Sequence, residues 1–221
     1  PVPMPSAARP GLRAAALAFL LAMATLAMTW VTTPPELPTA TYYEFLFWGA
    51  GHILQVASVM GMLVAWLLLL NSALGRAPIQ RRTGSILFGL LLLPLFGGPV
   101  LAGIGGATAT YRAGFTLLMR WAIFPMVSVF LILCIRALIQ AKREGRLPER
   151  GLLDPRLVGF YVSAGLTVLG FILGSQIRGS NTMVPAHYHA SIGAVTASFM
   201  AVTWVLIGPL GIRLDTARRK A

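Results

Sequence analysis

The chain has 221 residues, of which 57% are hydrophobic and only 11% are charged. Because water-soluble domains carry about 25% charged residues, this composition excludes an ordinary soluble enzyme and a disordered chain, and it predicts a membrane protein. The formal net charge of +12 does not indicate nucleic-acid binding, because the basic residues fall in short gaps between apolar segments. A single cysteine, Cys134, excludes a disulfide within this chain and a metal centre built from several of its cysteines.

Six apolar segments are each about as long as a helix that crosses a bilayer, which needs about 20 residues. The predicted spans are residues 12–31, 43–70, 85–104, 115–139, 157–177 and 186–210. The first could also be a signal peptide, since Arg9 and Arg13 precede it, but it is long and has no clean small-x-small cleavage pattern before Thr32. We therefore predict an all-α polytopic membrane protein in which residues 1–221 form a single membrane domain.

The basic residues predict the orientation of the spans. Fifteen of the eighteen Lys and Arg lie before or at the start of the first span, between spans two and three, around the gap between spans four and five, or in the C-terminal tail. Short loops rich in Lys and Arg face the cytoplasm, so both termini are predicted to lie on that side. The longest basic stretch, residues 141–156, mixes Lys, Arg, Glu and Pro. This pattern favours a solvated loop, with an anionic-lipid or docking site as the alternative.

The three histidines all lie within predicted spans, where an ionisable side chain is costly and by default suggests function. In the predicted orientation, His52, His187 and His189 lie toward the outer side of the membrane. Residues two apart on an α-helix differ by about 200° around its axis, so His187 and His189 are predicted to face opposite ways. They can serve two separate centres on either side of the last span. Histidines that bond to a neighbouring helix for structural reasons are the alternative.

Two segments around these histidines resemble subunit I of the haem-copper oxidases. The segment from Asn181 to Met200, NTMVPAHYHASIGAVTASFM, resembles the tenth helix of that subunit, where an H-x-H pair binds the irons of two haems. The segment from Phe45 to Gln55, FLFWGAGHILQ, resembles the sixth helix, whose His binds the active-site copper. The resemblance implies that His187 binds the oxygen-reducing haem, that His189 binds the low-spin haem and that His52 matches the copper ligand. It spans helices five to ten, about half of the family's catalytic subunit.

The chain departs from the family pattern at the copper site. The family's seventh helix carries a His-His pair, whereas the corresponding segment here, PLFGGPVLAGIGGATATYR, contains no His. Pro94, Pro99 and the two glycines between them are predicted to kink or break this span. The Pro, Glu and Tyr that follow the copper ligand in the family correspond to Ile53, Leu54 and Val56. A copper centre is therefore not expected, and the resemblance implies a haem site without copper.

The resemblance thus implies a bis-His haem b between spans two and six, with His52 and His187 as axial ligands. The chain would then be an electron-transfer subunit of a larger membrane redox complex in a bacterial inner membrane, with a cytochrome c-type or other redox partner on the outer side. His189 either binds a second haem completed by another chain or bonds a neighbouring helix or water. Two other functions stay open: part of a split terminal oxidase or nitric oxide reductase, whose missing ligands come from another chain, and a structural subunit without a cofactor.

Arginines and acids near the outer side are further candidates. Arg112 and Arg178 lie at the outer ends of predicted spans and either pair with haem propionates or extend to the membrane interface as basic side chains often do. Arg120 lies within an apolar span, where an unpaired charge is expensive. Its candidate partners are a haem propionate, an acid of another chain and, within this chain, Glu44. Glu36 and Glu44 are the two acids on the outer side. Each either stabilises the start of a helix, takes part in a proton route or binds a partner.

Overall fold

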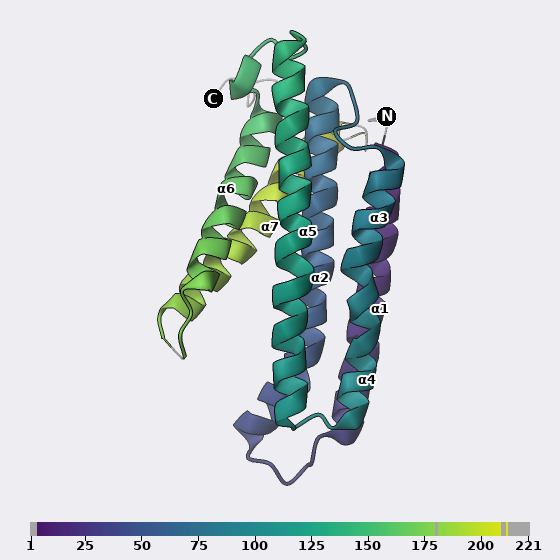
Figure 1. Ribbon diagram of the computed structural model, residues 1–221, viewed down its shortest axis with the longest axis vertical. Helices are drawn as coiled ribbons and strands as arrows, with labels where there is room; N and C mark the ends of the chain where they lie inside the picture. Colours follow the sequence, from purple (N-terminus) through teal and green to yellow (C-terminus); the bar gives the residue numbers. More distant parts are fainter. Residues whose placement is uncertain (1–3, 180, 209–210, 212–221) are drawn as a thin grey trace. The chain divides into compact units, whose positions relative to one another are not determined.

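The computed structural model of this chain describes residues 4–179, 181–208 and 211. These residues form helices joined by short connections, and no β-strand occurs among them. In chain order the helices are α1 (Ala8–Thr32), α2 (Thr39–Leu74), α3 (Arg81–Leu92), the 3-10 helix η1 (Leu93–Phe96), α4 (Gly97–Ile104), α5 (Ala109–Arg143), the 3-10 helix η2 (Gly151–Leu153), α6 (Pro155–Ser175) and α7 (Met183–Ile207) (Figure 1).

Six helical segments of the described chain are long and apolar enough to cross a membrane: α1, α2, the interrupted segment from α3 to α4, α5, α6 and α7. This confirms the prediction of an all-α polytopic membrane protein. The helices α2 and α5 extend several residues beyond the predicted spans 43–70 and 115–139, because helical hydrogen bonding continues past the apolar stretch that marks a span in sequence. The predicted end of the last span at residue 210 and the basic tail lie outside the described residues. The cytoplasmic position of both termini stays a prediction.

The third span is interrupted at the position predicted from its prolines and glycines. Residues 93–96 form a turn of 3-10 helix between α3 and α4. Pro94 has no backbone N–H to contribute to an α-helical ladder, so the tighter turn replaces it locally. A Cβ on Gly98 would overlap the Ile53 side chain of α2 and would lie 3.0 Å from Oγ1 of Thr25 on α1. The glycine therefore permits close approach of three helices.

The described helices group into two compact units. The first, here called the His52 unit, comprises residues 6–64 and 79–133 and contains α1, α3, α4 and the first parts of α2 and α5. The second, here called the His187 unit, comprises Ala65–Pro78 and the described residues from Cys134 onward, with residues 4 and 5. It contains α6, α7 and the last parts of α2 and α5. Both α2 and α5 pass continuously from one unit into the other, and a single membrane domain stays a prediction.

In the His52 unit, α1 lies beside α3 and α4 (Figure 1). Thr25, Thr29 and Thr33 are spaced four residues apart on one buried side of α1. The Thr25 and Thr29 hydroxyls each donate to the carbonyl four residues earlier, at 2.8 Å. The Thr32 hydroxyl lies 2.8 Å from the carbonyl of Ala102 on α4. The bonds of Thr25 and Thr29 satisfy buried hydroxyl groups, whereas the buried hydroxyl of Thr33 has no partner in the described part of the chain.

In the His187 unit, α6 and α7 form a closely packed hairpin (Figure 1). A buried serine, Ser163 of α6, connects it to α2. The indole N–H of Trp66 on α2 donates to Ser163 Oγ at 2.8 Å, and Ser163 Oγ donates to the carbonyl of Ala194 on α7 at 2.7 Å. One hydroxyl thus accepts from one helix and donates to another, which fixes the register of α2, α6 and α7.

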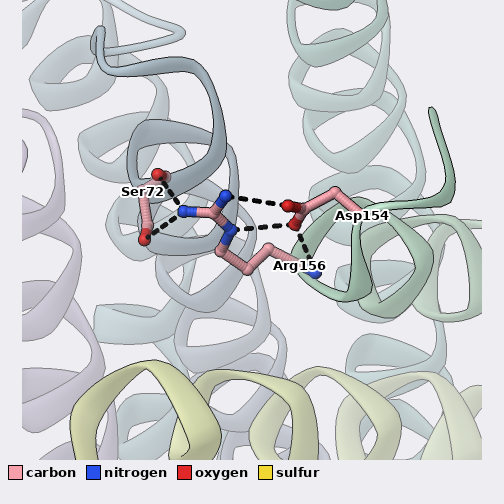
Figure 2. A network of polar contacts seen from close by, with 3 residues as sticks. All are labelled: Ser72, Asp154 and Arg156. Atoms are coloured by element: carbon pink, nitrogen blue, oxygen red, sulfur yellow. Dashed lines mark hydrogen bonds and ion pairs between the residues drawn. The ribbon is translucent and has the colours of Figure 1, made fainter. Parts of the chain in front are cut away.

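A polar network joins the start of α6 to the end of α2 (Figure 2). Asp154 caps α6 by accepting the backbone N–H of Arg156 at 2.9 Å. The Arg156 guanidinium donates to both carboxylate oxygens of Asp154, at 2.8 Å each, and to the carbonyl of Ser72. Ser72 lies in the last turn of α2, where carbonyls lack helical partners and a cation is favourable. The hydrogen bonds from Arg156 hold the pKa of the Asp154 carboxyl below its ordinary value.

The first prediction concerns this network. Asp154→Ala removes a helix cap and leaves Arg156 without its carboxylate, so the free energy of unfolding should fall by about 1–2 kcal/mol. The matched control is Glu149→Ala, because Glu149 is exposed in the same connection and has no ion-pair partner among the described residues. Unfolding by SDS in mixed micelles, followed by circular dichroism, measures both variants. Equal losses of unfolding free energy in the two variants would contradict a stabilising role for the network of Asp154 and Arg156.

The pH dependence of this difference follows from the lowered pKa of Asp154. A carboxylate with a lowered pKa in the folded state stabilises the fold at pH values above its unfolded pKa, and this contribution is lost as the pH falls through the folded value. The stability gap between the wild type and Asp154→Ala should therefore stay constant near neutral pH and shrink below about pH 4. The same unfolding titration, repeated between pH 7 and acidic conditions, measures it.

Candidate functional site

His52 lies on α2, one turn after Trp48. Its Nδ1 is 2.6 Å from the Trp48 carbonyl oxygen. A carbonyl only accepts hydrogen bonds, so Nδ1 carries the hydrogen and Nε2 carries the lone pair. The ring is half-buried, with its centroid 4.6 Å from the Trp48 ring and 6.1 Å from the Phe115 ring. These contacts fix the imidazole while leaving Nε2 without a hydrogen-bond partner among the described residues.

Arg112, a predicted site residue, lies beside Trp48 in the same unit. Its guanidinium carbon is 4.7 Å from the Trp48 ring centroid and 5.6 Å from that of Phe45. It also forms an ion pair with Glu44 at 2.9 Å, and both side chains are about half exposed. Such an exposed pair contributes little to stability, so its effect is to hold the cation over the indole ring. The structure therefore brings a cation and an aromatic ring together next to His52.

The indole N–H of Trp48 is the unsatisfied donor of this site. Trp48 Nε1 is buried and has no hydrogen-bond partner in the described part of the chain. An unpaired buried N–H costs free energy, so such a group in a folded protein calls for a physical explanation. The site thus offers a lone pair on His52 Nε2, a free donor on Trp48 and a cation on Arg112. A ligand that combines a metal ion with carboxylates matches these three groups.

His187 lies in the His187 unit, with its ring against α6. Its Nδ1 is 2.7 Å from the carbonyl oxygen of Gly170, so Nδ1 again carries the hydrogen and Nε2 the lone pair. A Cβ added to Gly174 would lie 3.0 Å from both Cε1 and Nδ1 of the ring. Gly170 and Gly174 form a G-x-x-x-G pattern, which allows a close approach to the helix backbone. The imidazole occupies the space that Gly174 leaves open, whereas a Cβ on Gly170 would meet Ser191 of α7.

His189 lies on the same helix but faces elsewhere. Its side chain is exposed, and its Nδ1 is 2.8 Å from the carbonyl oxygen of Pro185, one turn earlier on α7. His187 is directed to α6 whereas His189 bonds only its own helix, in agreement with the rotation of about 200° expected for residues two apart. His189 Nε2 also has no hydrogen-bond partner among the described residues.

The arginines differ in their surroundings. Glu44, the candidate partner of Arg120 within this chain, pairs with Arg112 instead. Arg112 lies one turn from the start of α5 and reaches the first turns of α2, whereas Arg120 lies two turns further along and is exposed without an ion-pair partner in the described segments. Arg178 is exposed in the connection between α6 and α7.

The predicted site residues divide between the two units. His52 and Arg112 belong to the His52 unit, and His187, His189 and Arg178 belong to the His187 unit. Among the residues that the structure describes, no group of three or more His, Cys, Asp or Glu side chains is placed to hold a metal ion. A haem iron needs only one or two protein ligands, so single histidines are the relevant candidates. Ligation of one haem by His52 and His187 stays a prediction.

Sequence reasoning missed the polar residues that organise both units. Tyr111 is fully buried in the His52 unit, and Trp66 and Ser163 are fully buried in the His187 unit. Residue type could have marked these positions in the sequence, because a Tyr or Trp among apolar residues needs a partner for its O–H or N–H. The identity of each partner depends on the packing of helices that are distant in sequence.

Comparisons with known proteins give little further information. No family model matches the sequence, and no solved structure matches it. A protein of Aquifex aeolicus (strain VF5), described as an uncharacterized protein, is 28% identical over 200 residues. This alignment covers 85% of the present chain and 44% of the relative, so the chain spans less than half the length of that protein. The resemblance to haem-copper oxidases therefore stays a prediction.

The second prediction concerns the glycines under His187. Gly174→Ala places a methyl group against the imidazole, so the ring must move away from Gly170 and stability should fall by about 1–3 kcal/mol. Gly165→Ala is the matched control on the same helix, because a Cβ there meets nothing within 4 Å. This control should be neutral or slightly stabilising, since Ala favours helix over Gly. Unfolding titrations of the two variants measure the difference, and equal stability would contradict the packing of His187 against α6.

Proposed function

We propose that this chain is a haem b-binding electron-transfer subunit of a larger membrane redox complex. The observation that supports it most is shared by all three histidines: each bonds a backbone carbonyl through Nδ1 and keeps the lone pair of Nε2 free. Histidines that bind metals usually donate their other ring N–H to a carbonyl, a carboxylate or water, which fixes the tautomer and the ring direction. The Nδ1 bonds of the three rings therefore support the proposal that each ring binds a metal through Nε2.

His52 and His187 are the proposed axial ligands of one haem. Both rings are half-buried, and both are held by a backbone bond and by close packing. A haem held by both histidines would supply a one-electron redox couple and would leave no open position for oxygen.

The other groups around His52 suit a haem for a separate reason. Haem b carries carboxylates, and the unpaired indole N–H of Trp48 and the guanidinium of Arg112 are the donors that a carboxylate needs. Arg112 is held over the Trp48 ring, so the two donors lie side by side. Arg178, exposed at the outer end of α6, is the corresponding candidate in the His187 unit.

The proposed electron-transfer role follows from what these residues supply. A protein contributes ligands, burial and orientation to a haem, and the histidines, the apolar helices and the basic side chains supply these three. The proposed location is a bacterial inner membrane, with other subunits as partners and a cytochrome c-type or other redox protein on the outer side. His189 is exposed and its Nε2 has no hydrogen-bond partner among the described residues. It either binds a second haem that another chain completes, or only forms its hydrogen bond to Pro185 within α7.

The third prediction tests the haem ligands. The wild-type complex should give the reduced-minus-oxidised spectrum of a low-spin, six-coordinate haem b. His52→Ala and His187→Ala should each abolish this spectrum or convert it to a five-coordinate form that binds carbon monoxide. His189→Ala is the control, because it should leave this haem intact and lower the haem-to-protein ratio only if a second haem is present. A low-spin spectrum that survives the loss of His52 would overturn the proposed ligation.

Activity and metal analysis of the purified complex distinguish the proposed function from the two alternative functions. Oxygen or nitric oxide consumption, together with copper or non-haem iron in the purified complex, would identify part of a split terminal oxidase or nitric oxide reductase. Complete absence of haem from the intact complex would leave a structural subunit.

A further inference from the structure

The Tyr111 hydroxyl lies within the backbone hydrogen bonding of α2. Tyr111 belongs to α5 and is fully buried. Its Oη accepts the N–H of Gly49 at 2.9 Å and donates to the carbonyl of Phe45 at 3.0 Å. In a regular helix these two backbone groups, four residues apart, would bond to each other. The phenol oxygen therefore interacts with both groups of one turn of the helix ladder.

This turn is joined directly to His52 through a single peptide group. The N–H of Gly49 and the C=O of Trp48 belong to the same peptide. On one side of that peptide the N–H donates to Tyr111 Oη, and on the other the C=O accepts Nδ1–H of His52 at 2.6 Å. An acceptor on the N–H of a peptide polarises its C=O, so hydrogen bonds in such a chain strengthen one another. The Tyr111 oxygen thus influences how firmly Nδ1–H of His52 is held.

The direction of each bond is set by the available hydrogens. Tyr111 has one hydroxyl hydrogen, and the Phe45 carbonyl can only accept it. Oη is then free to accept the N–H of Gly49. A third contact, with Thr29 Oγ1 of α1 at 3.1 Å, lies on the same oxygen, and Thr29 also bonds the carbonyl of Thr25 at 2.8 Å. The bond to Gly49 therefore does not depend on Thr29.

Gly49 is required for this arrangement. A Cβ at position 49 would lie 2.6 Å from Tyr111 Oη and 2.7 Å from the Phe115 ring, so any other residue would displace the phenol. The Tyr111 ring also packs edge-on against Phe115, with centroids 5.0 Å apart. Phenylalanine at position 111 would preserve this packing, so only the hydroxyl accounts for the bonds to α2.

We propose that Tyr111 is a positioning residue for His52, acting through the peptide between Trp48 and Gly49. It strengthens the bond that keeps hydrogen on Nδ1 and thereby keeps the lone pair on Nε2, the atom that would bind iron. This inference rests on the proposed function for its role in haem binding. Its effect on the tautomer of His52 is independent of any haem.

The fourth prediction tests the tautomer in protein without haem. Nitrogen-15 NMR of histidine-labelled protein in lipid nanodiscs distinguishes the Nδ1–H and Nε2–H forms, and His52→Ala identifies the signals of His52. In Tyr111→Phe, the ratio of the Nδ1–H form to the Nε2–H form of His52 should fall by a factor of about three to ten, as expected when a hydrogen bond of ordinary strength is weakened. The signals of His187 and His189 should not change.

Matched variants separate this effect from general loss of structure. Tyr161→Phe makes the same chemical change in the His187 unit and should leave the ratio at its wild-type value. Thr29→Val removes a contact of Tyr111 but keeps the bond to Gly49, so it should also leave the ratio unchanged. Gly49→Ala retains Tyr111 but displaces it, and it should reproduce the effect of Tyr111→Phe. If Tyr111→Phe does not fold, Gly49→Ala tests the positioning role of Tyr111.

A second readout applies to protein that contains haem. Tyr111→Phe should weaken haem binding by up to about tenfold and raise the reduction potential, because a less strongly held Nδ1–H makes His52 a poorer donor to ferric iron. If the wild type binds no haem, the proposed function fails, and the tautomer ratio still tests Tyr111. If folded Tyr111→Phe keeps the wild-type ratio, the positioning role is wrong, whatever the haem content.

Discussion

The structure depends on one constraint: polar groups within apolar helices must find their hydrogen-bond partners inside the protein, because lipid offers none. Thr25 and Thr29 meet this constraint within their own helix. Ser163 meets it between helices, by accepting from Trp66 and donating to a carbonyl of α7. Tyr111 meets it by bonding to both sides of a turn of α2. The bonds of Ser163 and Tyr111 therefore also fix one helix to its neighbour.

The same constraint acts on the histidines and produces their chemical state. A half-buried imidazole with a carbonyl beside Nδ1 keeps its hydrogen there, so the lone pair stays on Nε2. His52 and His187 reach this state by different means, one through a carbonyl of its own helix and the other through a carbonyl of α6. A structural requirement of the membrane environment thus leaves ligand atoms available, and the proposed haem site makes use of it.

Much of the fold was predictable because its signals are local. Spans follow from apolar length, and the break at Pro94 follows from the missing N–H of proline. The ends of α2 and α5 were less predictable, since polar turns beyond the apolar stretch remain helical. The partner of Glu44 could not be predicted, because the choice between Arg112 and Arg120 depends on how α5 is rotated and shifted against α2.

The sequence by itself determined the class of protein, the six apolar helices and the three histidines as the candidate ligands, because composition, length and residue type depend only on the chain. The tertiary structure decided which atoms of these residues are paired. Gly170 and Gly174 hold His187 against α6, and the peptide before Gly49 connects Tyr111 to His52. Gly174 lies 13 positions from His187, Gly170 lies 17 positions from it, and Gly49 lies 62 positions from Tyr111. Only helix packing brings such residues within hydrogen-bond distance, and no local pattern encodes that distance.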